Sequence, residues 1–62
     1  MNKDFIALMN DVQEYRQHKA DRDPDAKREY YFLRARIERT WREGKLNGME
    51  MGTLTDIMEE RR

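Results

Sequence analysis

The side chains in this sequence that are able to do chemistry are carboxylates, arginines and one histidine. Cysteine and serine are absent, so the commonest nucleophiles and any thiolate metal site are absent too. His18 is the single histidine. Glu14, four residues before it, has the spacing of an acid that pairs with it along a helix. A general base needs a positioned partner. We therefore expect a solvated or helix-capping histidine and no catalytic residue.

The segment 21–25, with the sequence DRDPD, superficially resembles the opening of a calcium-binding loop. Such a loop needs a glycine at its sixth position and a glutamate at its twelfth. Ala26 and Phe32 stand at these positions, so we predict no metal site and no cofactor. We interpret the segment instead as a connector, in which Asp23 caps the next helix and Pro24 takes its first position.

Length and composition restrict the function further. The chain has 62 residues, of which 42% are charged and 37% are hydrophobic. A chain of this size forms one domain with a thin core, and it struggles to enclose the pocket of a few hundred Å³ that small-molecule chemistry needs. We therefore expect a protein that is not an enzyme and has no small-molecule substrate. Self-association is a common way to compensate for a thin core, so a homodimer is one option.

Charge is unevenly distributed, although the formal net charge is zero. Residues 26–45 carry a balance of +4, while residues 1–25 and 46–62 each carry −2. The acidic ends would repel phosphate, which disfavours a protein that binds nucleic acid with its whole surface. The pattern suits charge complementarity within the chain or head-to-tail contact between chains.

No targeting or membrane signal is visible in the sequence. The apolar run at residues 5–9 is shorter than the hydrophobic core of a signal peptide, and no run approaches the length of a membrane crossing. Together with the absence of cysteine, this predicts a cytoplasmic protein without a membrane partner.

The hydrophobic spacing predicts an all-α fold in a single domain over residues 1–62. Three helices are expected, over about residues 3–20, 24–43 and 47–61. The first two are long enough to pair as an antiparallel hairpin, and the short third helix should close over its open side.

Particular residues mark the expected helix ends. Asn2 is suited to cap the first helix, and Gly44 indicates the end of the second. Asn47 and Glu50 have the spacing of a capping box for the third helix. A later start of that helix, with Thr53 as its cap, is the competing boundary.

One stripe of the second helix is the predicted core. It consists of Ala26, Tyr30, Leu33, Ile37 and Trp41. We expect Trp41 to be its largest single contributor. The third helix continues an apolar period that includes Met49, Leu54 and Met58. Methionines either fill gaps in such a core or form an adaptable binding surface, with Met51 the candidate for partial exposure.

The opposite side of the second helix is the candidate contact surface. It holds Arg28, Tyr31, Phe32, Ala35 and Arg39, and we call it the aromatic–arginine surface. Two interpretations stay open: the third helix covers Phe32, or Phe32 is exposed and anchors a protein partner. Aromatic residues and arginine are the types most enriched at binding hot spots. The leading hypothesis is therefore a small protein-interaction module or regulator, which acts on a foreign partner or as a homodimer.

A nucleic-acid-associated regulator is the alternative hypothesis. Its phosphate contacts would come from Arg28, Arg34, Arg36, Arg39 and Arg42. Tyr31 or Phe32 could then stack on bases. The interleaved acids and the lack of a helix-turn-helix pattern argue against it. Phosphate binding weakens steeply with salt, whereas a contact centred on an aromatic anchor changes less, so salt dependence separates the two hypotheses.

Overall fold

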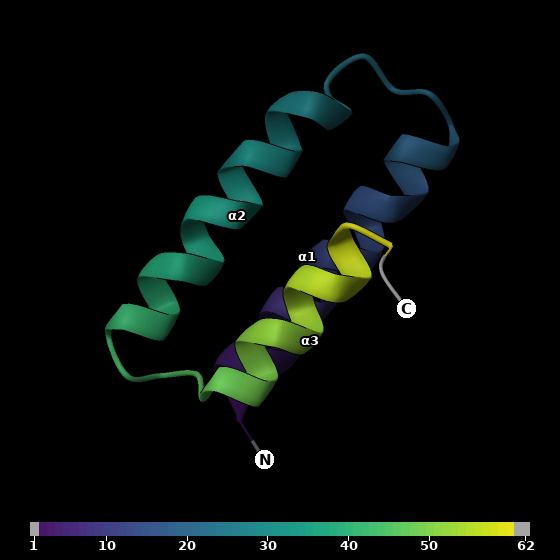
Figure 1. Ribbon diagram of the computed structural model, residues 1–62. Helices are drawn as coiled ribbons and strands as arrows, with labels where there is room; N and C mark the ends of the chain where they lie inside the picture. Colours follow the sequence, from purple (N-terminus) through teal and green to yellow (C-terminus); the bar gives the residue numbers. More distant parts are fainter. Residues whose placement is uncertain (1, 61–62) are drawn as a thin grey trace.

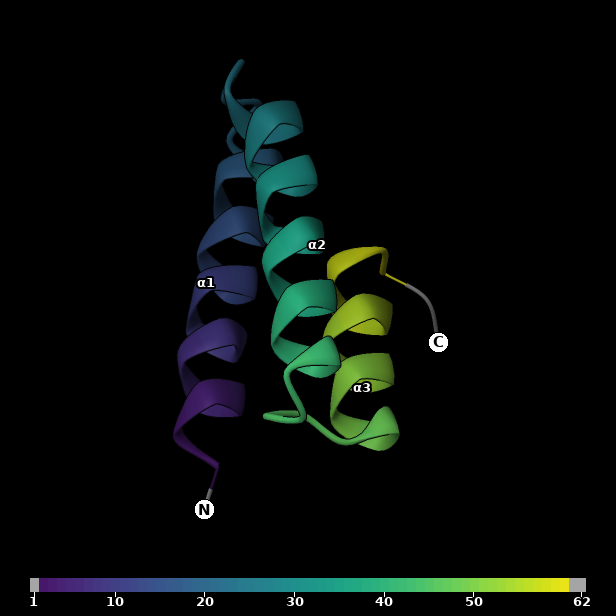
Figure 2. The same ribbon diagram turned by 90° about the vertical axis from the view of Figure 1, so that its left-hand side faces the viewer.

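The chain folds as three packed helices in a computed structural model that describes residues 2–60 (Figure 1). The helices are α1 (Lys3–Ala20), α2 (Ala26–Arg42) and α3 (Gly48–Met58). Helices α1 and α2 run antiparallel, and α3 returns in the direction of α1 (Figures 1 and 2). Each helix packs against both of the others. The predicted all-α architecture, a helical hairpin with a short third helix, is confirmed.

Helix α1 begins and ends where the sequence predicts. The Asn2 side chain accepts hydrogen bonds from the backbone N–H groups of Asp4 and Phe5, at 3.0 and 3.3 Å, and so satisfies donors that have no partner within the helix. The helix ends at Ala20. The predicted N-cap and both predicted ends of this helix are thus confirmed.

Helix α2 begins at Ala26, two residues later than predicted. The Asp23 carboxylate accepts the backbone N–H of Asp25 at 2.9 Å, and the Asp23 carbonyl accepts that of Ala26 at 3.1 Å. These bonds close a turn before the helix, because an aspartate side chain competes well for nearby backbone donors. The predicted cap at Asp23, with Pro24 at the first helical position, is therefore wrong.

The connector to α3 contains the signals that the sequence indicated. Gly44 adopts a φ of +78°, the left-handed conformation that commonly ends a helix. In the capping box, the Asn47 side chain accepts the Glu50 N–H at 2.7 Å, and the Glu50 carboxylate accepts the Asn47 N–H at 3.1 Å. Helix α3 therefore begins at Gly48, and the competing start at Thr53 is wrong.

Helix α3 ends at Met58, earlier than predicted. The predicted end, residue 61, lies outside the described residues. At its other end α3 is tied to the start of α1, because the Asn2 amide donates to the Glu50 carboxylate at 3.1 Å and to the Lys45 carbonyl at 2.7 Å. This contact holds the beginnings of α1 and α3 together.

The core lies along the shared axis of the three helices. Its buried members are Leu8, Val12, Tyr15, Ala26, Leu33, Ile37, Leu46, Leu54 and Met58. This confirms most of the predicted stripe of α2, with Tyr30 packed at the edge of the cluster.

The core prediction for Trp41 is wrong, and Met49, for which the sequence left two roles open, lies outside the core. Trp41 is 41% exposed, because it lies in the last turn of α2 and borders an open crevice toward Met51 and Thr55 of α3. Met49 is 82% exposed. It precedes Leu54 by five residues, which places it about 140° around the helix from that buried side chain. Met51 is partly buried against the core, as expected.

Candidate functional site

The aromatic–arginine surface is exposed along its whole length. Tyr31 and Phe32 expose 61% and 68% of their surface, and Arg28, Ala35 and Arg39 are exposed as well. Helix α3 packs on the other side of α2, so the interpretation in which the third helix covers Phe32 is wrong. The five residues that the sequence grouped do lie on one side of α2.

Contacts beside this surface hold one of its rings in place. The Tyr31 ring lies edge-on to the Tyr30 ring, with 5.3 Å between the centroids. Tyr30 in turn donates its hydroxyl hydrogen to the Glu59 carboxylate at 2.8 Å. Tyr31 therefore packs against a ring that is itself anchored to the end of α3. A contact residue whose neighbours are fixed loses less conformational freedom on binding.

Phe32 borders a small hollow on the outer side of α2. Phe32, Ala35, Arg36 and Arg39 line this hollow, which has a volume of about 180 Å³. The small Ala35 side chain leaves the space between the aromatic ring and the guanidinium groups. An apolar group of a partner could enter there beside Phe32.

The arginines do not form one continuous basic row. Three of the five proposed phosphate ligands are in ion pairs. The pairs are Arg34–Glu59, Arg36–Asp11 and Arg42–Glu38, the last two with N–O distances of 2.7 Å. Within residues 2–60, the side chains of Arg28 and Arg39 take part in no ion pair or hydrogen bond. Of these five arginines, the two that form no such contact are the ones that belong to the aromatic–arginine surface.

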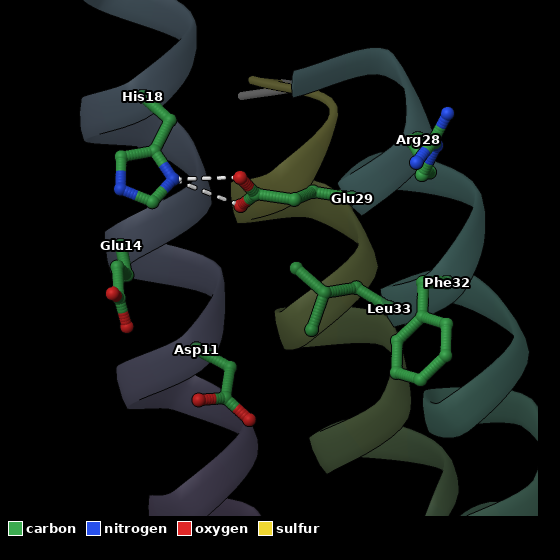
Figure 3. A pocket seen from close by; sticks show the side chains of 7 residues that line it. All are labelled: Asp11, Glu14, His18, Arg28, Glu29, Phe32 and Leu33. Atoms are coloured by element: carbon green, nitrogen blue, oxygen red, sulfur yellow. Dashed lines mark hydrogen bonds and ion pairs between the residues drawn. The ribbon is translucent and has the colours of Figure 1, made fainter. Parts of the chain in front are cut away.

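An open groove lies between α1 and α2, next to Phe32. The α1/α2 groove is lined by Asp11, Glu14, His18, Arg28, Glu29, Phe32 and Leu33 and has a volume of about 390 Å³. All of these residues belong to α1 or α2, and Figure 3 looks into the groove with α3 behind it. The groove therefore lies on the face of the hairpin that α3 leaves uncovered.

His18 and Glu29 form the main polar contact across this groove (Figure 3). The His18 Nδ1 lies 2.7 and 3.0 Å from the two carboxylate oxygens of Glu29. This hydrogen bond raises the pKa of His18. Desolvation lowers the pKa, and the negative charges of Glu29, Asp23 and Glu14 raise it further. The His18 side chain stays 34% exposed, and it pairs with an acid from α2 because the antiparallel hairpin brings Glu29 closer than the helical neighbour Glu14.

The same histidine belongs to the one group of possible metal ligands in the described part of the chain. The ligand atoms of His18, Asp23 and Glu29 lie within 4.8 Å of one another. An imidazole with two carboxylates is a donor set that zinc or iron accepts. The His18–Glu29 hydrogen bond already satisfies two of the three groups, and all three are only partly buried. Asp21 and Asp25, the other acids of the predicted connector, are not members of this group.

The sequence did not single out the acidic side of the groove. Asp11, Glu14 and His18 follow one another at three- and four-residue steps, so they share one strip of α1. This spacing was the available signal. Their partners Glu29 and Arg36 come in reverse order on α2, as expected for an antiparallel pair, but the helix rotation that brings them together follows from the packed core.

Comparison with known proteins gives no relative. No protein-family model, curated protein or solved structure matches this chain. Among residues 2–60, none of the helices combines the length and the apolar character that a membrane crossing requires. The function is therefore inferred from the surface of the chain itself.

Proposed function

We propose that this chain is a small, non-enzymatic, cytoplasmic protein that acts by binding another protein through its aromatic–arginine surface. The observation that carries the proposal is the exposure of two adjacent rings, Tyr31 and Phe32, in a chain with a thin core. A folding domain gains nothing from leaving such rings in water. Burying the Phe32 ring at an interface contributes about 2 kcal/mol.

The charges around the rings support a protein partner. Arg28 and Arg39 flank Phe32 and have no carboxylate partner of their own within residues 2–60. Arginines in this position donate to carboxylates of a partner at the rim of an apolar contact. A ring with arginines beside it is the composition typical of a binding hot spot.

The nucleic-acid alternative has weaker support. Arg34, Arg36 and Arg42 already neutralise carboxylates of this chain, so phosphate would have to compete with those pairs. The acidic strip of α1 also borders the same face of the molecule. A phosphate backbone along α2 would be repelled by that strip.

Site-specific photocross-linking tests the proposal. A photoreactive phenylalanine analogue is placed at position 32, and at position 6 as the matched control, since Ile6 is also an exposed apolar side chain but lies on α1. In an extract of the source cells we expect a discrete protein adduct from position 32 and none from position 6.

Competition distinguishes the outcomes of this experiment. Excess unlabelled wild-type protein should suppress the adduct, and excess Phe32→Ala should not. Adducts that are the same from both positions would contradict the proposed surface. Loss of the adduct after nuclease treatment would favour the nucleic-acid alternative.

A further inference from the structure

The uncovered face of the α1–α2 hairpin carries charges of opposite sign on its two edges. We propose that this face binds a second copy of the chain, related to the first by a twofold axis parallel to the helices. This inference rests on the proposed function and names its partner. Three observations support it: the α1/α2 groove lies on the uncovered face, acids and bases lie on opposite edges of that face, and only one twofold arrangement of two copies brings these opposite charges together.

The α1 edge is mainly acidic, with the exposed Lys3 as a base on the same strip, and the α2 edge is basic. On the α1 edge, Asp4 and Glu14 lie seven residues before and three after the groove residue Asp11, so all three share one strip. Arg28 and Arg39 lie on the outer edge of α2. In the described part of the chain, none of these four side chains, Asp4, Glu14, Arg28 and Arg39, forms a hydrogen bond or an ion pair. Within residues 2–60, two acids and two bases on one face thus form no ion pair.

Symmetry then selects one arrangement of two copies. In a twofold dimer both copies use the same surface, so the surface must complement itself. An axis that lies in the face and crosses the helices would set α1 against α1 and acid against acid. An axis parallel to the helices sets the acidic edge of α1 against the basic edge of α2 of the second copy. Opposite charges meet only in this second arrangement.

The heights of the charges agree with this axis. Two pairs across the hairpin fix the relative heights of the helices. They are Asp11–Arg36 and His18–Glu29. Counted from these pairs, Arg39 of the second copy lies roughly one helical turn from Asp4. Arg28 of the second copy lies about one and a half turns from Glu14. Both separations are within reach of an extended arginine side chain.

The exposed aromatic residue fits the same arrangement. An axis parallel to the helices keeps every residue at its own height, so the two Phe32 rings come to the same level on either side of the axis. Each ring borders the α1/α2 groove of its own chain. The second copy therefore covers the apolar part of the groove together with the ring that the fold leaves exposed.

A second copy matches this face better than another acidic partner does. A foreign acidic helix would neutralise Arg28 and Arg39 but would be repelled by Asp4 and Glu14. The face is also large enough: the molecule measures 33 × 21 × 18 Å, so a face along its length is comparable with the roughly 800 Å² that each partner contributes to a stable interface. The product is a four-helix bundle with the two α3 helices on the outside.

Sedimentation equilibrium with charge reversals tests the proposal. We expect the wild type to form dimers in the micromolar to millimolar range, and Glu14→Arg or Arg28→Glu alone to weaken dimerisation about tenfold or more, because each reversal acts at two symmetric contacts. An equimolar mixture of the two variants should restore dimerisation as a heterodimer, since both contacts then join opposite charges. Lys27→Glu is the matched control: it reverses an exposed charge next to Arg28 but on another side of α2.

Each outcome decides the question. Restoration in the mixture, with no effect of Lys27→Glu, supports the parallel axis. A Glu14→Arg variant that associates more tightly, or a mixture that is not restored, overturns the arrangement. A wild type that remains monomeric to about 1 mM overturns the second copy as partner. In that case a cross-link from position 32 to a different protein would still support the proposed function.

Discussion

At the scale of single residues, the neighbours of a side chain decide its role more than its type does. His18 is the only histidine, and on its own helix it has no acid partner in contact. The packed hairpin places Glu29 2.7 Å from its Nδ1. The sequence could not show this pair, because the two residues belong to different helices whose relative rotation depends on the core.

The His18–Glu29 pair predicts a pH dependence of stability. The hydrogen bond raises the pKa of His18 above its usual value of 6.5, so the pair stabilises the fold fully below that pH. Its contribution is lost as the pH rises through the folded-state pKa. His18→Gln should therefore lower the free energy of unfolding at about pH 5.5 and have less effect at about pH 8.5. Urea unfolding at the two pH values measures the difference.

Glu29→Gln is the control for this effect. It removes the charged acceptor and leaves the histidine in place, so it should abolish the same part of the pH dependence. A loss from His18→Gln that is equal at both pH values would show that packing, and not the charged pair, is responsible.

At the scale of elements, capping residues set the start of the short third helix. Asn47→Ala removes one side of the capping box and should lower the free energy of unfolding by about 1 kcal/mol. Asn10→Ala is the matched control, because Asn10 is exposed in the middle of α1 and alanine favours a helix. Thermal unfolding of both variants checks the prediction, which fails if Asn47→Ala is neutral.

Two glycines should respond to substitution in opposite directions. Gly52 lies inside α3, and an added Cβ would meet no atom within 4 Å, so Gly52→Ala should stabilise the protein by about 0.5–1 kcal/mol. Gly44 has a φ of +78°, where alanine is strained, so Gly44→Ala should destabilise it by about 1 kcal/mol. Melting temperatures that move in the same direction would contradict this account of the connector.

The helices were predictable from sequence to the extent that their signals are local. Asn2 and the Asn47–Glu50 box fixed two starts correctly, because a cap is formed by residues near it in the chain. The predicted start of α2 was wrong, because Asp23 can either cap a helix or close a turn, and in the structure it closes a turn. The prediction that Trp41 is buried was wrong for a different reason. Trp41 does lie on the core stripe of α2, but it is in the last turn of the helix, where no neighbour covers it.

At the scale of the whole molecule, one narrow core supports three helices. Ile37 is buried in this core, and an unpaired carboxylate there costs several kcal/mol, comparable with the stability of a domain this small. Ile37→Asp should therefore abolish cooperative thermal unfolding. Phe32→Asp is the matched control on the same helix and should still unfold cooperatively. Cooperative unfolding of Ile37→Asp close to the wild-type temperature would contradict the assigned core.

The sequence predicted the aromatic–arginine surface of the candidate site but not the groove beside it. The periodicity of α2 separated Phe32 and Arg39 from the core, and this grouping agrees with the structure. The groove beside them was not predictable, because it depends on which side of the hairpin α3 covers. That choice also decides which acids of α1 face the arginines.

In the proposed function, Phe32 contacts another chain and does not stabilise the fold. The urea midpoint of the wild type and of Phe32→Ala, measured from about 5 μM to about 1 mM protein, separates these two roles, because association raises the apparent stability with concentration. We predict a midpoint that rises with concentration for the wild type, a constant midpoint for Phe32→Ala, and equal midpoints at the lowest concentration. A constant wild-type midpoint would contradict the second copy as partner, and a Phe32→Ala midpoint that is lower by the same amount at every concentration would show that Phe32 stabilises the fold.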